Sequence, residues 1–549
     1  MIKPDLWIPA NNLTLEPNAL TAVKEQHRSL ALTAGPGAGK TEMLAQKADF
    51  LLRTGVCHYP KRILAISFKK DASSNLKERV QLRCGSNLSR RFDSFTFHAF
   101  AKRIIDKYRV LLTGLDELEP NYSVGMERID KKQIDFDSLV PLALQIINSS
   151  SIVRSSILQT YSDVFLDEFQ DCTDTQYELI KAIFYNSNIK LTAVGDTKQK
   201  IMGWAGALEG IFLRFTADFN AQPLNMYRNF RSKPQLLRLQ NEIIRILDPN
   251  SVMAKDLIVG NEGIISHESF NNSLDEAEYL SNLIQSWITE EKIPPSEIAI
   301  LVSKQIEHYT SDLITALRTK EIPFRNEQSM QDISTEPVAR LIIDYLLCLY
   351  GPRNPKAWTK VNNLLSPFDV DEQTRISILR KFNHFFKEQK KKFLAVGYQP
   401  PIESWLDAIR ALFRHLGLST LIALSPEYES KSYLKDVIKQ LKKIINDFLS
   451  QEADLLKALN SFGHDETVKL LTIHKSKGLE FHSVILLGVE NETFWGKLEN
   501  ERCAFFVGIS RAKERLILTA STERHLDNPP SRWATHRNPH DEFFNYRVE

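Results

Sequence analysis

The chain has 549 residues and a mass of 63.0 kDa, which exceeds what one hydrophobic core accommodates and predicts about three or four domains. Its 70 Lys and Arg nearly balance 68 Asp and Glu, so the formal charge of +2 excludes a global basic field, and any nucleic-acid contact requires a local groove. Five scattered cysteines without a Cys-x-x-Cys pair argue against zinc or iron–sulfur ligation. They fit a reducing cytoplasm, and without a signal-peptide core or a membrane-length apolar run we expect a cytoplasmic protein with no membrane partner.

The pattern of a phosphate-binding loop lies near the start of the chain. Residues 34–41 read Ala-Gly-Pro-Gly-Ala-Gly-Lys-Thr, between an apolar strand pattern at 29–33 and helical spacing at 42–52. Glycines let backbone N–H groups curl around a phosphate at a helix N-terminus, Lys40 reaches the β/γ-phosphates, and Thr41 offers its hydroxyl to Mg²⁺. The alternative, a Gly-rich turn that binds nothing, is disfavoured by the Gly-Lys-Thr ending. The first position is Ala instead of Gly, so the strict pattern is met with one substitution.

A second pattern supplies the carboxylates that a nucleotide-hydrolysing site needs. Residues 164–171 read Val-Phe-Leu-Asp-Glu-Phe-Gln-Asp, an apolar strand that ends in Asp167 and Glu168. Asp167 can hold the same Mg²⁺ as Thr41. Glu168 follows at the position where a carboxylate orients and deprotonates the attacking water.

Short apolar strands alternate with helical patterns towards both ends of the chain, which predicts an α/β fold with parallel sheets. The strand candidates are residues 63–68, 164–167, 191–195, 298–302, 468–473, 484–488 and 516–520. Two stretches with few strand candidates look like helical insertions. We expect a first core from 1–99 and 160–222, a short helical insertion at 100–159, a second core from 223–330 and 462–549, and a helical insertion at 331–461.

Several further sequence segments resemble the motifs of superfamily 1 helicases of the UvrD/Rep/PcrA type. Residues 471–481, Leu-Thr-Ile-His-Lys-Ser-Lys-Gly-Leu-Glu-Phe, resemble the fifth motif almost letter for letter. The other motif-like segments occur in the order in which the family has them, at 63–72, 96–98, 167–171, 194–199 with 203–207, 227–232 and 501–512. The resemblance implies two RecA-like P-loop cores, each carrying a mainly helical insertion, with ATP between them at the carboxyl ends of their strands.

The resemblance also implies residue roles in an ATP and Mg²⁺ site. Gln199 is placed to sense the γ-phosphate, and Arg231 and Arg511 act as arginine fingers from the second core. With these three, the expected catalytic residues are Lys40, Asp167 and Glu168, and the expected Mg²⁺ ligands are Thr41 and Asp167. The expected nucleotide-binding residues are Gly35, Pro36, Gly37, Ala38, Gly39, Lys40, Thr41, Phe230 for base stacking, Gly478, and Glu480 for the ribose.

Single-stranded nucleic acid is expected to cross both cores. Phe68 and Trp204 are candidate stacking platforms, because every base has a π-face, although core packing is the alternative for both. The candidate phosphate or sugar contacts are Ser67, His98, Thr472 and His474.

The chain departs from the family pattern at four positions. Ala19 stands where a Gln that reads adenine is expected, although Asn18 could substitute after a one-residue slip. Glu42 replaces the Arg that often follows the loop, while Met202 and Ala205 replace a Tyr and an Arg of the third motif. Adenine stacking on an aromatic is therefore retained, adenine hydrogen bonding is reduced, and the grip on the strand is weakened.

The sequence therefore predicts an ATP-dependent 3′→5′ single-stranded DNA translocase and helicase, acting on single strands and tailed duplexes. One alternative is a nucleotide-gated DNA-binding switch that hydrolyses ATP without processive movement, acting with a separate nuclease. A nuclease–helicase ranks lower, because no carboxylate-plus-Lys nuclease cluster is evident. Repair, recombination and anti-phage defence beside a separately encoded nuclease are the expected pathways.

Overall fold

The computed structural model describes residues 2–68, 70–125, 127–199, 210–327, 333, 336–365, 372–394, 404–425, 428, 431–451, 454–460, 462, 467–526, 528–531 and 533–546. These residues form two compact units. The first unit comprises Met1–Glu117, Asp137–Phe324 and Val468–Glu549, and the second comprises Leu118–Phe136 and Arg325–Thr467.

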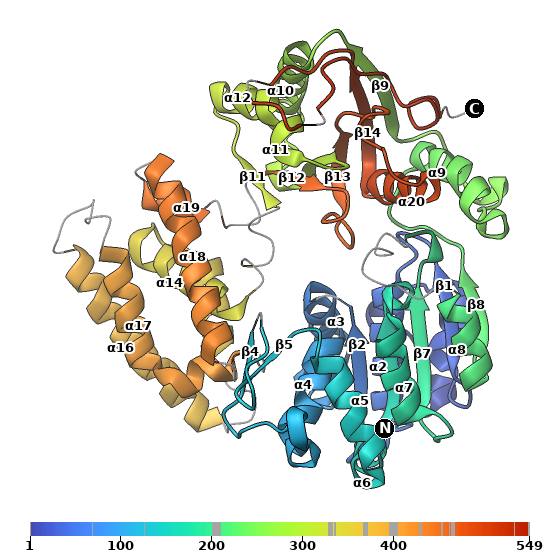
Figure 1. Cartoon of the computed structure of the whole chain (residues 1–549), viewed down its shortest axis with the longest axis vertical. Helices are drawn as coiled ribbons and strands as arrows, with labels where there is room; N and C mark the ends of the chain where they lie inside the picture. The colour runs from blue at the N-terminus through green and yellow to red at the C-terminus, as the bar shows by residue number, and fades with distance from the viewer. Residues whose placement is uncertain are drawn as a thin grey trace. The chain divides into compact units, whose positions relative to one another are not determined.

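The first unit contains a six-stranded sheet with the order β3-β2-β6-β7-β1-β8, in which every pair of neighbouring strands is parallel (Figure 1). The inner strands are buried along almost their whole length, as expected for a parallel sheet covered on both faces. The strands are β1 Leu30–Ala34, β2 Arg62–Ser67, β3 Phe92–Thr96, β6 Tyr161–Asp167, β7 Lys190–Gly195 and β8 Gln222–Met226. The helices are α1 Pro17–Lys24, α2 Lys40–Thr54, α3 Lys70–Ser89, α4 Phe97–Tyr108, α5 Leu139–Ser149, α6 Ser151–Thr160, α7 Asp174–Phe184 and α8 Ile211–Phe219.

A second six-stranded sheet in the same unit has the order β11-β12-β10-β13-β14-β9. Strands β9, β10, β12, β13 and β14 run parallel. The strands are β9 Ile264–Phe270, β10 Ile298–Val302, β11 Phe324–Asn326, β12 Val468–Thr472, β13 Phe481–Leu486 and β14 Ala512–Ser521. The helices are α9 Pro234–Leu247, α10 Ser273–Thr289, α11 Ile306–Tyr309, α12 Ser311–Thr319 and α20 Leu498–Ile509.

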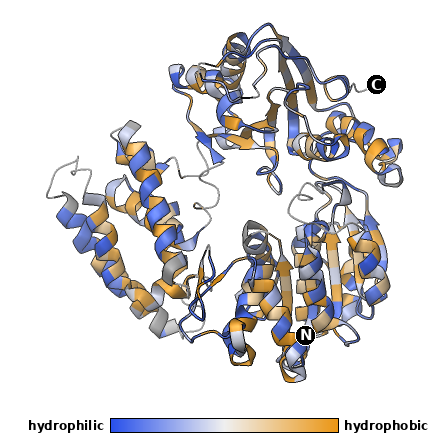
Figure 2. Ribbon diagram, viewed as in Figure 1, coloured by the Kyte–Doolittle hydropathy of each residue, from blue (hydrophilic) through white to orange (hydrophobic). Residues whose placement is uncertain are grey.

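The second unit is mainly helical, and its helices turn their apolar sides towards one shared core (Figure 2). A two-stranded sheet, β4 Ser123–Gly125 with β5 Gln133–Asp135, belongs to this unit and packs against α18. The helices are α14 Pro337–Tyr350, α15 Pro355–Leu365, α16 Glu372–Leu394, α17 Ser404–Ala423, α18 Lys431–Gln451 and α19 Leu455–Asn460.

The expected α/β class with parallel sheets is confirmed. Every strand candidate from the sequence coincides with an inner strand of one of the two sheets. Residues 118–136, which lie within the expected insertion at 100–159, group with residues 325–467.

Candidate functional site

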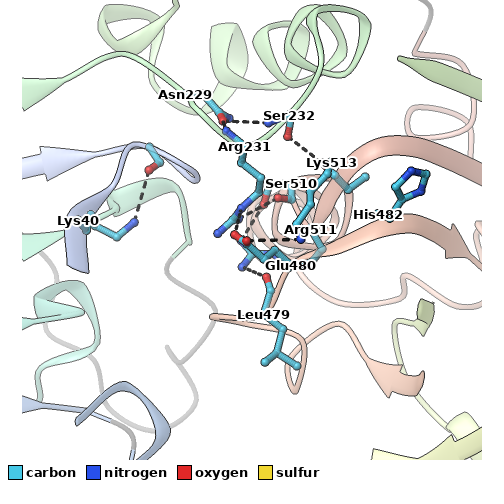
Figure 3. A network of polar contacts seen from close by, with 12 residues as sticks. Lys40, Asn229, Arg231, Ser232, Leu479, Glu480, His482, Ser510, Arg511 and Lys513 are labelled. Atoms are coloured by element: carbon cyan, nitrogen blue, oxygen red, sulfur yellow. Dashed lines mark hydrogen bonds and ion pairs between the residues drawn. The ribbon is translucent and has the colours of Figure 1, made fainter. Parts of the chain in front are cut away.

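The phosphate-binding loop joins β1 to α2 and has the backbone shape that its glycines allow. Gly37 and Gly39 have φ angles of 70° and 81°, in the left-handed region that favours glycine. A Cβ at Gly37 would also collide with the side-chain oxygen of Asn229. Both the φ angle and the lack of space therefore favour glycine at this position. Lys40 folds back on the loop, and its Nζ donates to the carbonyl of Ala34 at 3.3 Å (Figure 3). Such a long contact is readily exchanged for a phosphate oxygen.

The two carboxylates lie at the carboxyl end of β6. Asp167 is buried, and its Oδ1 accepts from the backbone N–H of Glu168 at 3.0 Å. Glu168 has a φ of 53°, a strained conformation for a residue with a side chain, and its Oε2 accepts from the Gln170 amide at 2.6 Å. Burial followed by the charge of Glu168 raises the pKa of Asp167. Burial would also raise the pKa of Glu168, but the positive charge of Lys40 and other nearby cations outweighs it and lowers that pKa.

This donor set fits a hydrated Mg²⁺ ion. Asp167 supplies a buried carboxylate at the end of β6, and Thr41 places a hydroxyl on the first turn of α2. Mg²⁺ binds through one or two protein oxygens and keeps several waters, so a larger ligand cluster is unnecessary. Within the described residues, no group of three or more His, Cys, Asp or Glu side chains could hold a metal ion.

The two predicted arginine fingers lie together with Glu480 (Figure 3), Arg511 just before β14 of the second sheet and Arg231 in the segment that joins β8 of the first sheet to α9. Arg511 is 1% exposed, and its Nη2 donates to Gln199 Oε1 of the first sheet at 3.1 Å. Arg231 pairs with Glu480, with 2.8 Å between Nε and Oε2, and also donates to the carbonyl of Ser510 at 3.1 Å. Burial, followed by the charge of Arg231, lowers the pKa of Arg511 to about 9, so this guanidinium stays protonated at neutral pH. The structure thus brings together Gln199, Arg231, Arg511 and Glu480, as the sequence predicts.

A hydrogen-bond network connects the carboxylates with these arginines. Gln170 donates to Glu168 and accepts from the backbone N–H of Asp196 at 3.0 Å. Asp196 in turn accepts from the Gln199 amide at 3.0 Å, and Gln199 contacts Arg511. The sequence reasoning gave Gln170 and Asp196 no role, although both lie inside the quoted motifs.

A buried ion pair, also missed from the sequence, joins the two sheets. Lys477 Nζ lies 2.5 Å from Asp171 Oδ2 and 2.9 Å from the carbonyl of Gln199. Both charged side chains are almost completely buried, at 3% and 1% exposure. The two residues are far apart in sequence, and only their positions in two of the quoted motifs, 167–171 and 471–481, could have indicated the pair.

We expect removal of one partner of this pair to be costly. Lys477→Met leaves the Asp171 carboxylate buried and unpaired, which should lower the free energy of unfolding by about 3–5 kcal/mol and reduce turnover with it. The double variant Lys477→Met/Asp171→Asn should recover most of that loss. Urea denaturation and ATPase rates measure both effects. Lys391→Met, which breaks an exposed pair with Glu388, is the control and should change the free energy of unfolding by less than about 1 kcal/mol. If Lys477→Met lowers the free energy of unfolding no more than Lys391→Met does, the buried pair is unimportant.

The position of the expected nucleotide-binding residues in the second sheet corrects one expectation. In the first sheet the site residues follow the carboxyl ends of β1, β6 and β7. In the second sheet, however, Glu480 precedes β13 and Arg511 precedes β14, so these residues lie at the amino ends of their strands. The reason is that the segment after β12 crosses β10, which lies between them, to reach the start of β13.

The predicted nucleic-acid residues lie at the carboxyl edges of the two sheets. Phe68 and His98 follow the neighbouring strands β2 and β3 and are half-buried, whereas Ser67 is completely buried. Burial lowers the pKa of His98, which favours its neutral form. Thr472 ends β12, with His474 just beyond it, and its hydroxyl accepts from the backbone N–H of Lys475 at 3.4 Å. Trp204, Met202 and Ala205 lie outside the described residues.

The region expected to hold the base offers stacking more than hydrogen bonding. Phe230 is 54% exposed, and its backbone N–H donates to the carbonyl of Gly37 at 3.0 Å, which places the ring beside the loop. Ala19 is buried, and the Asn18 amide donates to the carbonyl of Asn225 at 2.6 Å. Glu42 puts a negative charge where a cation is expected, and this carboxylate pairs with Arg79 and Arg83 on α3.

Comparisons with known proteins agree with this geometry. Residues 15–129 and 120–220 match the model of the UvrD/REP helicase N-terminal domain. Residues 224–392 and 371–523 match the UvrD-like helicase C-terminal domain. The chain belongs to the UvrD/Rep helicase family. The family match spans both sheets and the intervening helical unit, so it is not limited to a generic phosphate-binding loop.

Curated members of this family resemble the chain over most of its length. The ATP-dependent DNA helicase PcrA of Bacillus subtilis is 25% identical over 646 residues, covering 94% of this chain and 85% of the relative. DNA helicase II of Escherichia coli is 24% identical over 616 residues, covering 92% and 84%. The ATP-dependent DNA helicase Rep of Buchnera aphidicola is 24% identical over 623 residues, covering 90% and 89%. None of these names supports the anti-phage expectation. Among the described residues, no helix has the length and apolarity that crossing a membrane requires.

Proposed function

We propose that the chain is an ATP-dependent DNA helicase that moves along single-stranded DNA in the 3′→5′ direction. The observation that carries this proposal is the contact of Arg511 with Gln199, because it joins the second sheet to the hydrolytic network of the first. Family membership and the names of the relatives supply the DNA substrate and the use of ATP.

In this proposal each group acts on ATP at a stated position. Lys40 leaves the loop carbonyls to bind the β/γ-phosphates, and Phe230 stacks on the base. Glu168, kept ionised by its cationic neighbours, orients and deprotonates the attacking water while Gln170 fixes its side chain. Arg231 and Arg511 neutralise charge that develops on the γ-phosphoryl group. A bound Mg²⁺, held by Thr41 and Asp167, supplies further neutralisation of phosphate charge.

Hydrolysis can be coupled to movement because the same loops serve both ligands. The segment from Thr472 to Glu480 begins at the carboxyl edge of the second sheet, where the strand is proposed to bind, and ends at the nucleotide site. Loss of the γ-phosphate removes a partner of Arg231 and Arg511, which weakens the contact between the two sheets. Alternation between two such arrangements moves the grip along the strand.

Polarity is tested with a duplex that carries either a 3′ or a 5′ single-stranded tail. We expect ATP-dependent unwinding of the 3′-tailed duplex only, with an ATPase rate that rises with the length of the single strand. Unwinding from the 5′ tail would refute the polarity. An ATPase rate independent of strand length, with no unwinding of either duplex, would favour the nucleotide-gated switch. Efficient unwinding of several hundred base pairs by the isolated chain would remove the need for a nuclease or other partner.

The base region predicts relaxed nucleotide selectivity. Ala19 has no polar side-chain atom and the Asn18 amide is bonded to Asn225, so stacking on Phe230 provides most of the base contact. A site that stacks a base discriminates far less than one that hydrogen-bonds it, and we expect kcat/KM for ATP and GTP to agree within about tenfold. Asn18→Ala should leave that ratio unchanged. A preference for ATP of ~10³-fold that disappears in Asn18→Ala would show that Asn18 reads adenine after all.

A further inference from the structure

The segment between β13 and α20, two elements labelled in Figure 1, contains Trp495, which no motif includes. Trp495 is 68% exposed, and it is the one tryptophan among the large exposed apolar side chains of the described residues. A single exposed apolar side chain is common at protein surfaces, so the role of this ring must be inferred from the groups around it.

The indole is held in place by its surroundings. Its neighbour Phe494 is buried among Phe505, Phe543 and His540, with ring centroids 5.1 Å from Phe543. On the other side, the backbone N–H of Gly496 donates to Glu501 at 2.9 Å. The ring therefore lies between two anchored residues, and binding against it would cost little conformational entropy.

A lysine lies against one face of this ring. Lys304 Nζ is 4.0 Å from the ring centroid, a close cation–π contact, and it also pairs with Glu501 at 2.7 Å. A flat aromatic ring with an adjacent cation offers one surface for a base and one charge for a phosphate. Proteins that bind single-stranded nucleic acid without sequence preference combine aromatic stacking with positive charge in the same way.

Trp495 and Lys304 lie at the edge of the second sheet where the strand is proposed to bind. Lys304 follows the carboxyl end of β10, and Trp495 follows the carboxyl end of β13. Because β10, β12 and β13 are parallel, these ends meet at one edge, together with Thr472 and His474 after β12. The backbone N–H of Ile473 donates to the carbonyl of Val302 at 2.8 Å, which places the His474 turn beside Lys304.

We propose that Trp495 and Lys304 form a base-stacking site for single-stranded DNA on the second sheet. One base stacks on the indole, and the Lys304 ammonium lies close to the ring and contributes positive charge along the strand. The site rests on the proposed helicase function and adds a contact that the motifs do not include. It also gives the second sheet an aromatic platform to match Phe68 on the first.

The test measures the affinity of the full chain for fluorescein-labelled oligo(dT) at fixed salt. Trp495→Ala should raise Kd about 5- to 150-fold, the range expected for loss of one stacked base, and Trp495→Phe should restore most of the affinity. Tyr59→Ala is the matched control, because Tyr59 is an exposed ring with Arg91 5.9 Å from its centroid but precedes β2, at the amino edge. The Tyr59→Ala variant should bind oligo(dT) with the same Kd as the unaltered chain.

A second measurement does not depend on substitution. Photocrosslinking of oligo(dT) containing 5-iodouridine to the unaltered chain, followed by mass spectrometry, should identify the peptide that contains Trp495. If the unaltered chain binds oligo(dT) but Trp495→Ala binds equally well and no crosslink forms at this peptide, the inference is overturned and the ring serves a protein partner or none. If the unaltered chain does not bind oligo(dT) at all, the proposed function itself fails.

Discussion

The Glu168→Gln variant should bind ATP with near-native affinity and hydrolyse it about 10²–10⁴-fold more slowly, which is the usual contribution of a positioned general base. The substitution keeps the size of the side chain and its acceptor for the Gln170 amide, while removing the negative charge that the nearby cations hold ionised. DNA-stimulated phosphate release measures turnover, and a fluorescent ATP analogue measures binding.

The lysine variant separates binding from chemistry at the same site. Lys40→Ala removes the ammonium that now contacts the loop carbonyls, so nucleotide binding and turnover should both be lost. Lys47→Met is unsuitable as a control because Lys47 is buried against α1. Lys497 is exposed beside α20, so Lys497→Met should leave nucleotide binding and turnover unchanged.

Normal ATPase rates in folded Glu168→Gln protein would falsify the assignment of Glu168 as the base.

Local sequence predicted the phosphate loop and the inner strands because each is specified by neighbouring residues. Positive φ angles at Gly37 and Gly39 follow from the glycine spacing itself. Inner strands are buried on both faces and favour continuous apolar runs, as in β10, which reads Ile-Ala-Ile-Leu-Val and is buried throughout.

The strands missing from the prediction are the edge strands of the two large sheets, β3, β8, β9 and β11, and the two short strands β4 and β5. An edge strand is half solvated and needs no apolar run, and β8 even contains Pro223, which an edge tolerates. Polar sequences such as Gln222–Met226 carry little periodic signal, so sequence reasoning assigned them to no element.

The parts of the site that sequence reasoning missed depend on contacts between distant segments. Lys477 and Asp171 were both inside quoted motifs, but their pairing depends on how the two sheets meet. The burial of Ser67 likewise follows from its position between β3 and β6, which the motif does not reveal. Motifs therefore indicated which residues line the proposed nucleotide site, but not how Lys477 and Asp171 pair between the two sheets.

The arginine variants should lose turnover without a comparable loss of ATP affinity. Arg231→Ala and Arg511→Ala should each lower kcat by roughly 10³-fold, as for other arginine fingers, because the positive charge matters most when charge develops on the γ-phosphoryl group. Arg511→Lys should recover little, since one ammonium cannot reproduce the fork that contacts Leu479, Ser510 and Gln199 together. Steady-state kinetics with saturating single-stranded DNA give kcat and KM separately.

Two controls distinguish a catalytic role from a structural one. Arg502 lies on α20, the helix that ends just before Arg511, and pairs with Glu542 at 2.8 Å, so Arg502→Ala should keep kcat within about twofold, as expected for a partly exposed ion pair. Glu480→Gln weakens the pairing of Arg231 without removing the arginine, and should raise KM more than it lowers kcat, because Glu480 is assigned to the ribose. Near-native DNA-stimulated turnover in either arginine variant would show that this arginine only holds the loops together. Both Arg231→Ala and Glu480→Gln weaken the ion pair, but only the first removes the charge of Arg231. If the two variants lower kcat equally, the effect belongs to the ion pair and not to the charge of Arg231.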